Sequence, residues 1–124
     1  MNKELVNKIV TMFNTGDTTE VSNIFGKDYL DHQKPEWFTV DGPEEFAQIV
    51  KLACNNLPNL KVTVLGKIIA EENMVAVRLL WSSDVNVRET IEILRVEDGK
   101  FVEHWGAQSY EKKVNEIQDR ISSI

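Results

Sequence analysis

The stretch "MVAVRLLWSSDVNVRETIEILRVEDGKFVEHWGAQ", residues 74–108, decides the fold of this chain. It consists of runs rich in Val, Ile and Trp, which are typical of β-strands, separated by short polar segments. The Asp-Gly dipeptide at 98–99 predicts a tight hairpin turn, because both residue types tolerate positive φ angles. The segment "LKVTVLGKIIAEEN" at 60–73 has the same character and ends in a second turn signal, Glu-Asn at 72–73. Four consecutive antiparallel strands joined by short loops, a meander, are therefore predicted.

Upstream of the strands, the apolar residues recur with the period of a helix. Near the N-terminus they share one helical face: Leu5, Ile9, Met12 and Phe13. Capping boxes at 17–20 ("DTTE") and 41–44 ("DGPE") predict the starts of a short second helix and of a third helix. A further apolar stripe predicts a C-terminal helix: Val114, Ile117, Ile121 and Ile124. This order of elements predicts an α+β fold in which helices cover one face of an antiparallel sheet.

Composition and charge narrow the class of protein. The length of 124 residues predicts a single domain, residues 1–124. The net charge of −6 argues against binding to nucleic acid and to an anionic membrane surface. The N-terminus lacks the apolar core of a signal peptide, and no apolar run is long enough to span a membrane. Cys54 is the only cysteine, so no disulfide is expected. These features predict a cytoplasmic protein.

Several short motifs, taken in order, resemble one family. They are "Y-x-x-H" at 29–32, "DGPEEF" at 41–46, "NLPNLKVTV" at 56–64, "MVAVR" at 74–78 and "DGKFVEHWG" at 98–106. Together they resemble the SnoaL-like polyketide cyclases, which belong to the nuclear transport factor two-like superfamily, and the resemblance covers roughly residues 5–110. It implies a strongly curved antiparallel sheet wrapped around the N-terminal helices, which forms a cone with a pocket at its open end.

The resemblance also implies a kind of chemistry. Enzymes of this superfamily, such as ketosteroid isomerase and scytalone dehydratase, transfer protons on small apolar substrates, and the SnoaL cyclases close rings by an intramolecular aldol step. A small apolar or ring-shaped carbonyl compound is therefore the expected ligand. The step requires a base whose pKa is tuned by its surroundings and which lies about 3 Å from the proton that it removes.

The chain departs from the family at the residue that carries this step. In the cyclases an Asp about four residues after the Trp of the last strand serves as acid and base, and here that position is Ser109, beside Gln108. Neither side chain acts as a base near neutral pH without activation. The connection "WSSDVN" at 81–86 is also short, so a pocket histidine of the family has no counterpart. Cyclase activity does not follow from the resemblance.

Two residues are the candidates for a replacement acid or base. His32 has an unperturbed pKa that suits proton transfer, and the resemblance directs it to the pocket; Asp31 beside it would then face solvent. His32 could instead fix a loop through a backbone hydrogen bond. Glu103 could be a buried acid with a raised pKa, or it could pair with an arginine of a neighbouring strand. The arginines available for that pairing are Arg78, Arg88 and Arg95.

Strand alternation assigns the remaining candidates. One face of the last strand is expected to carry Glu103, Trp105 and Ser109, and the other face His104 and Gln108. A bulge in the strand would exchange the two faces for the residues beyond it. We expect Trp105 to line the cone and Trp81 to lie at an interface. The full set of expected ligand-binding residues is Tyr29, Trp37, Arg78, Trp105, Gln108 and Ser109.

Two kinds of function remain open. One is a small enzyme that uses His32 and Glu103 as acid and base on an apolar carbonyl compound. The other is a non-catalytic ligand-binding or dimerisation module that has lost the acid of the family. No metal is expected, because His32 and His104 are the only histidines and no carboxylates cluster beside them at ligand spacing, and no other cofactor is expected. Apolar side chains on the outer sheet face predict a homodimer.

Overall fold

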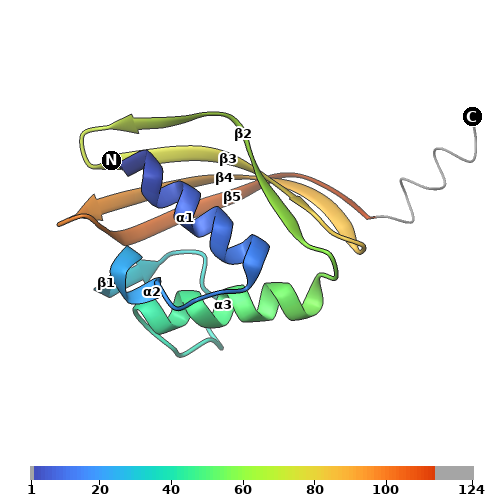
Figure 1. Cartoon of the computed structure of the whole chain (residues 1–124), viewed down its shortest axis with the longest axis horizontal. Helices are drawn as coiled ribbons and strands as arrows, with labels where there is room; N and C mark the ends of the chain where they lie inside the picture. Colours follow the sequence, from blue (N-terminus) through green and yellow to red (C-terminus); the bar gives the residue numbers. More distant parts are fainter. Residues whose placement is uncertain (1, 114–124) are drawn as a thin grey trace, which may run out of the picture.

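A computed structural model of the protein describes residues 2–113 (Figure 1). In chain order its elements are α1 (Asn2–Thr15), α2 (Val21–Ile24), β1 (Phe25–Asp31), α3 (Pro43–Asn56), β2 (Lys61–Glu71), β3 (Met74–Ser82), β4 (Asn86–Glu97) and β5 (Lys100–Lys113). The predicted α+β class is confirmed. The C-terminal helix predicted at 114–124 lies outside the described residues. No helix within 2–113 has both the length and the apolar character needed to cross a membrane.

The predicted meander is confirmed. Strands β2 to β5 pair antiparallel, each with the next, and the sheet order is β1-β5-β4-β3-β2. Both predicted turns contain residues with positive φ: 54° at Glu72, 51° at Asp98 and 75° at Gly99. Such angles match the right-handed twist of the flanking strands, so the hairpins fix the register of the sheet.

The edge strand β1 was not predicted, and it determines where the site lies. It pairs in parallel with β5, with Leu30 opposite Glu103 and Asp31 opposite His104. The pairing continues one residue further, because the His32 N–H donates to the His104 carbonyl at 3.0 Å. Residues that are more than seventy positions apart in sequence therefore lie side by side.

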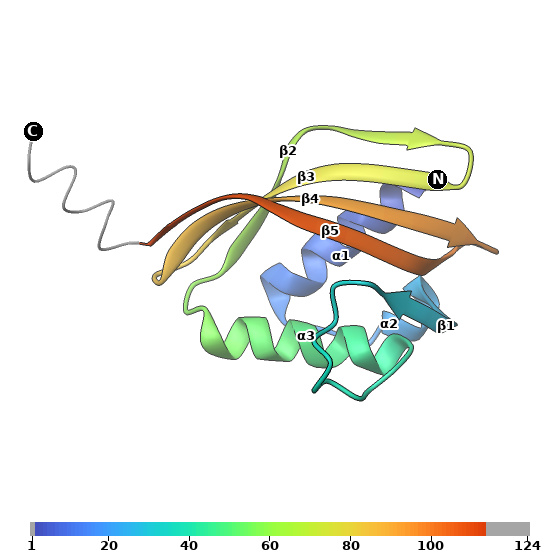
Figure 2. The same ribbon diagram turned by 180° about the vertical axis from the view of Figure 1, so that it is seen from behind.

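The helices cover the concave face of the sheet (Figures 1 and 2). Aromatic rings fill the space between the two layers. Phe25 stacks on Phe46 with ring centroids 4.2 Å apart, and Phe13 meets Trp81 edge to face at 4.7 Å. Trp81 is only 6% exposed, and its indole N–H donates to the Thr90 hydroxyl at 2.8 Å. The expectation that Trp81 lies at an interface is therefore wrong, because its position on β3 faces the core.

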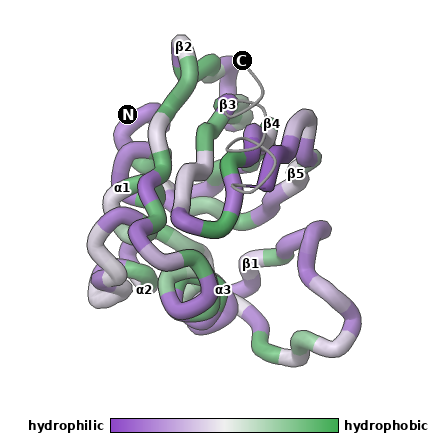
Figure 3. Tube along the Cα trace, turned by 90° about the vertical axis from the view of Figure 1, so that its right-hand side faces the viewer, coloured by the Kyte–Doolittle hydropathy of each residue, from purple (hydrophilic) through white to green (hydrophobic). Residues whose placement is uncertain are grey.

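Neither predicted capping box forms. The N-cap of α3 is Gly42, with φ 70° and no side-chain cap, and Asp41 instead accepts a hydrogen bond from Lys34 Nζ at 2.6 Å. A Cβ on residue 42 would lie 2.8 Å from the Lys27 carbonyl oxygen, so the close approach requires glycine. In the first box Asp17 bonds to Thr19 rather than to the helix that follows. The wide loop between β1 and α3 leaves the sheet edge (Figure 3).

Candidate functional site

A cavity of about 240 Å³ opens between the helices and the concave face of the sheet. Most of its wall is apolar and includes Val6, Ile9, Phe13, Phe46, Leu79 and Leu94. Such a cavity at the mouth of a curved sheet is the usual form of a small-molecule site. Its volume suits a small ligand.

Polar side chains enter the cavity from alternate positions of β4 and β5. Arg88, Thr90 and Glu92 come from β4, and His104 comes from β5. Gly106 lies opposite Glu92, and a Cβ at residue 106 would lie 2.7 Å from Glu92 Oε1. The absence of a side chain at residue 106 thus lets the Glu92 carboxylate lie over the backbone of β5, where it reaches His104.

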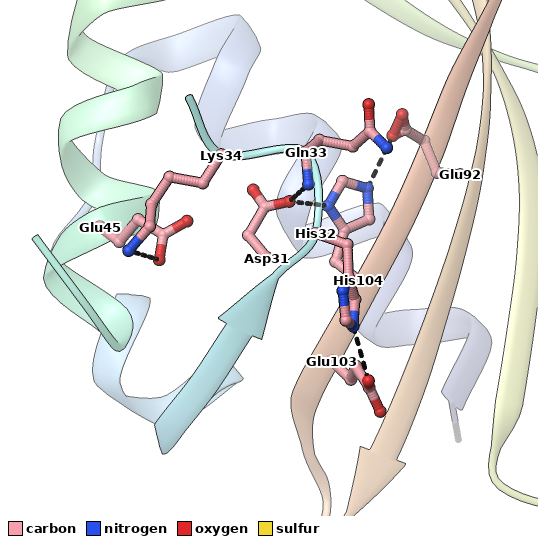
Figure 4. A network of polar contacts seen from close by, with 8 residues as sticks. All are labelled: Asp31, His32, Gln33, Lys34, Glu45, Glu92, Glu103 and His104. Carbon is pink, nitrogen blue, oxygen red and sulfur yellow. Dashed lines mark hydrogen bonds and ion pairs between the residues drawn. The ribbon is translucent and has the colours of Figure 1, made fainter. Parts of the chain in front are cut away.

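His104 is held between two carboxylates (Figure 4). Its Nδ1 lies 2.9 Å from Asp31 Oδ1 and its Nε2 lies 3.0 Å from Glu92 Oε2. Burial alone would lower the pKa of His104, but the hydrogen bonds and charges of Asp31 and Glu92 outweigh it and raise the pKa to about 9. The ring is therefore an imidazolium at neutral pH, with both N–H groups donating to carboxylate oxygens.

Asp31 stands at the end of β1 on the cavity wall. Its Oδ1 accepts hydrogen bonds from His104 and from the Gln33 backbone N–H at 2.8 Å. Burial acts to raise the pKa of Asp31, but hydrogen bonding and the charge of His104 outweigh it, so the pKa lies below its usual value. Oδ2 meets neither an amide nor an imidazole donor among the described residues. Asp31 is therefore an ionised carboxylate whose Oδ1 is held by two donors and whose side chain also lies beside Glu45.

Glu45 of α3 lies on the other side of Asp31 (Figure 4). It is 1% exposed, neither carboxyl oxygen meets a donor within residues 2–113, and Lys34 Nζ is 3.8 Å away. Burial, and after it the charge of Asp31, raises the pKa of Glu45 to about 7 against the effect of Lys34. A protonated Glu45 can donate to Asp31, so the two carboxyl groups share a proton near neutral pH.

Replacing Glu45 with Gln is expected to remove part of the pH dependence of stability. The pKa of Glu45 rises from 4.5 to about 7 on folding, so its contribution is fully present below pH 4.5 and is lost as the pH rises through about 7. Between about pH 5.5 and about pH 8, urea titrations should show the wild-type free energy of unfolding falling by about 2 kcal/mol more than that of Glu45→Gln. Glu44→Gln, at an exposed position of the same turn, should behave like the wild type.

The predicted catalytic pair lies on the other face of the sheet. His32 Nε2 is 2.7 Å from Glu103 Oε2, and the His32 ring stacks on Trp105 with centroids 5.0 Å apart and an interplanar angle of 9°. Glu103 also accepts from Arg95 Nε at 2.9 Å, which is the arginine pairing that the sequence left open. None of these residues lines the cavity. The expectation that Trp105 lines the cone is wrong, because alternation along β5 turns His104 inward and its two neighbours outward.

The other expected ligand-binding residues divide between the two faces. Tyr29 and Gln108 line the cavity. Burial first, and then nearby carboxylates, raises the pKa of Tyr29 far above its usual value, so its hydroxyl remains a donor. Arg78 lies outside the cavity and pairs with Glu89 at 2.7 Å. The last two are also outside it: Trp37 is 74% exposed in the loop after β1, and Ser109 occupies a bulge of β5.

The carboxylate and histidine cluster itself was missed. Asp31 was expected to face solvent, because nothing in the local pattern shows that β1 pairs with β5. Two signals were available in the sequence. Glu45 falls within the apolar face of α3, and Glu92 alternates with Thr90 and Leu94 on the inward side of β4. Charged residues at positions of the core face are rare unless they are paired or functional.

Comparisons with known proteins agree with this architecture. Residues 3–110 match the model of a family described as SnoaL-like polyketide cyclase. TsrD from Streptomyces laurentii superposes with a TM-score of 0.74 at 16% identity, over 87% of each chain. A SnoaL-like polyketide cyclase from Agrobacterium tumefaciens superposes with a TM-score of 0.71 at 11% identity, over 95% of each chain. A loop truncation variant of IdmH, a protein of Streptomyces antibioticus, gives 0.72 at 20% identity, over 88% of this chain and 93% of that one. No curated protein sequence matches the chain.

Proposed function

The chain belongs to the SnoaL-like polyketide cyclase family, and on that premise we propose that its cavity binds a small apolar or ring-shaped carbonyl compound and transfers a proton beside the carbonyl. One observation carries the proposal. Asp31 is an ionised carboxylate on the wall of an otherwise largely apolar cavity, and its Oδ1 is held by His104 and by the Gln33 N–H. A carboxylate has about four acceptor positions, so Asp31 can take a substrate proton while His104, the Gln33 N–H and Glu45 hold it in place.

The proposed reaction has two steps. The Asp31 carboxylate takes a proton from the carbon next to the carbonyl, and the electron pair of the broken C–H bond moves to the carbonyl oxygen as an enolate. The Tyr29 hydroxyl, which stays protonated, donates a hydrogen bond to that oxygen. The enolate then takes the proton back from Asp31 at another carbon of its conjugated system, which gives isomerisation. Alternatively its carbon attacks a second carbonyl carbon, which closes a ring, and the alkoxide formed takes the proton from Asp31. The His104 imidazolium keeps Asp31 in place and offsets its charge.

Hydrogen exchange at carbon tests this proposal without knowledge of the natural substrate. The probe is 2-tetralone, a small bicyclic ketone, incubated with the protein in D2O and followed by proton NMR at its α-carbons. We expect exchange faster than in buffer alone, saturating with ketone concentration, because Asp31 removes the same type of proton. Exchange that shows no saturation, or that equals the rate with an equal concentration of an unrelated acidic protein, would refute the proposal.

A binding module without turnover is the second candidate. The observation that favours it is Ser109, which stands where the resemblance places the acid of the family and whose hydroxyl donates to the Glu89 carbonyl at 3.3 Å. Saturable binding of 2-tetralone with no exchange above background would support this candidate over the enzyme.

The outer face of the sheet supports the proposal of a homodimer. Large apolar side chains stand exposed there: Ile91 is 42% exposed and Ile93 is 39% exposed, on the face of β4 opposite to the cavity. A second copy of the chain would cover them. Light scattering of the wild type at micromolar concentration should give twice the monomer mass of 14.2 kDa. The double variant Ile91→Lys/Ile93→Lys should give the monomer mass. A wild-type mass of one chain contradicts the prediction.

A further inference from the structure

Arg88 of β4 occupies the cavity wall away from the carboxylate and histidine cluster. Its guanidinium lies over the Trp81 ring, 4.7 Å from the ring centroid. The ring is itself held, because its N–H donates to Thr90 at 2.8 Å. A guanidinium held over an aromatic ring by cation–π attraction does not use up its N–H donors, and these can receive a carboxylate through two parallel hydrogen bonds.

No ion pair with another residue of the range 2–113 balances the charge of Arg88. Its Nε is fully buried and has no hydrogen-bond partner among residues 2–113. Burial lowers the pKa of Arg88, and the charges of Glu92 and Glu111 act against that effect. Both of these carboxylates are bound elsewhere, however: Glu92 to His104 at 3.0 Å, and Glu111 to the Asn86 side chain at 2.8 Å. The two nearest acids therefore leave the guanidinium edge unoccupied.

Unlike Arg88, the two other arginines among residues 2–113 are paired with carboxylates. Arg78 pairs with Glu89 at 2.7 Å, and Arg95 pairs with Glu97 at 2.6 Å and with Glu103 at 2.9 Å. Both lie outside the cavity. If Arg88 only covered the Trp81 ring, an uncharged side chain of similar length would do so without the cost of burying an unpaired charge.

We propose that Arg88 receives a carboxylate of the ligand, so that the cavity takes a ring-shaped keto acid rather than a neutral ketone. The inference rests on the proposed function, because it assumes that this cavity is the ligand site. Arg88 and Asp31 both line the cavity, so the carboxylate of the ligand and the carbon that reacts at Asp31 belong to one bound molecule.

Paired probes test the assignment of Arg88. We chose 2-naphthoate and 2-acetylnaphthalene, which share a fused ring and differ in charge, and binding of each is measured by titration calorimetry. The wild type should bind 2-naphthoate at least about tenfold more tightly than the ketone. Arg88→Met, which keeps a side chain over Trp81, should lower naphthoate affinity at least about tenfold and leave ketone affinity within about twofold. Arg95→Met, which also replaces an arginine but outside the cavity, should change neither.

Each other outcome overturns the inference. If Arg88→Met loses affinity equally for both probes, Arg88 only supports the cavity wall. If its affinity for 2-naphthoate is unchanged, Arg88 does not bind the carboxylate. If Arg88→Met does not fold, Arg88→Lys replaces it, and naphthoate affinity equal to the wild type would then exclude a two-bond contact. Failure of the wild type to bind 2-naphthoate overturns the inference outright. If the wild type then still binds the ketone, the proposed function stands without this inference. If it binds neither probe, both the proposed function and the inference fail.

Discussion

Replacing Asp31 with Asn is expected to lower the α-proton exchange of 2-tetralone by at least about 100-fold, the usual contribution of a positioned base. The amide has nearly the same shape as the carboxylate, so it can still accept a hydrogen bond from His104 through its oxygen. It cannot take a proton from carbon near neutral pH. The measurement is the exchange rate at saturating ketone, and ketone affinity should change by less than about tenfold, about 1.4 kcal/mol.

The matched controls are His32→Gln and Glu103→Gln. These residues form a hydrogen-bonded pair outside the cavity, with side chains 37% and 19% exposed. Their expected catalytic roles remain predictions that the same assay tests. We expect both variants to exchange ketone protons within about threefold of the wild type, because general-base catalysis requires contact with the substrate. Loss of exchange in His32→Gln together with full activity in Asp31→Asn would reverse the assignment and return the base to the outer face.

Replacing His104 with Leu is expected to cost about 3–5 kcal/mol of folding stability near neutral pH. Asp31 and Glu92 are 13% and 15% exposed, and without the imidazolium their charges face each other with little solvent between them. Urea unfolding measures the loss. His32→Leu removes the half-buried hydrogen bond to Glu103, which Arg95 also binds, and should cost less than about 1 kcal/mol. Equal costs in the two variants would show that the buried cluster does not hold the fold.

The pH dependence of this loss is a second check on His104. Its pKa rises from 6.5 to about 9 on folding, so its stabilising contribution is fully present below pH 6.5 and disappears as the pH rises through about 9. The difference in unfolding free energy between the wild type and His104→Leu should therefore shrink as the pH rises from about 6.5 to about 9, and should change little above that. A difference that stays constant from neutral pH to about pH 10 would show that the histidine stabilises the fold by packing rather than by charge.

Local pattern was enough to predict most of the architecture. Strand runs, an Asp-Gly turn at 98–99 and a helical face beginning at Leu5 depend on residues close together in sequence, and they led to the correct meander and the correct layer of helices. The pairing of Glu103 with an arginine was also among the alternatives, because opposite charges on neighbouring strands are expected to meet. The second capping box failed because Lys34, from outside the helix, binds the carboxylate of Asp41, and the first failed because Asp17 bonds to Thr19.

The site depended on contacts that no local pattern contains. Either His104 or Trp105 faces inward, and strand alternation predicts only that their side chains lie on opposite faces of β5. The curvature of the sheet and the helices packed on it made that choice, by turning His104 toward the cavity. The sequence by itself determined the strands, turns and amphipathic helices, because these depend on neighbouring residues. Only the tertiary structure brought Asp31 beside His104, because the parallel pairing of β1 with β5 joins segments whose register is fixed by packing across the whole fold.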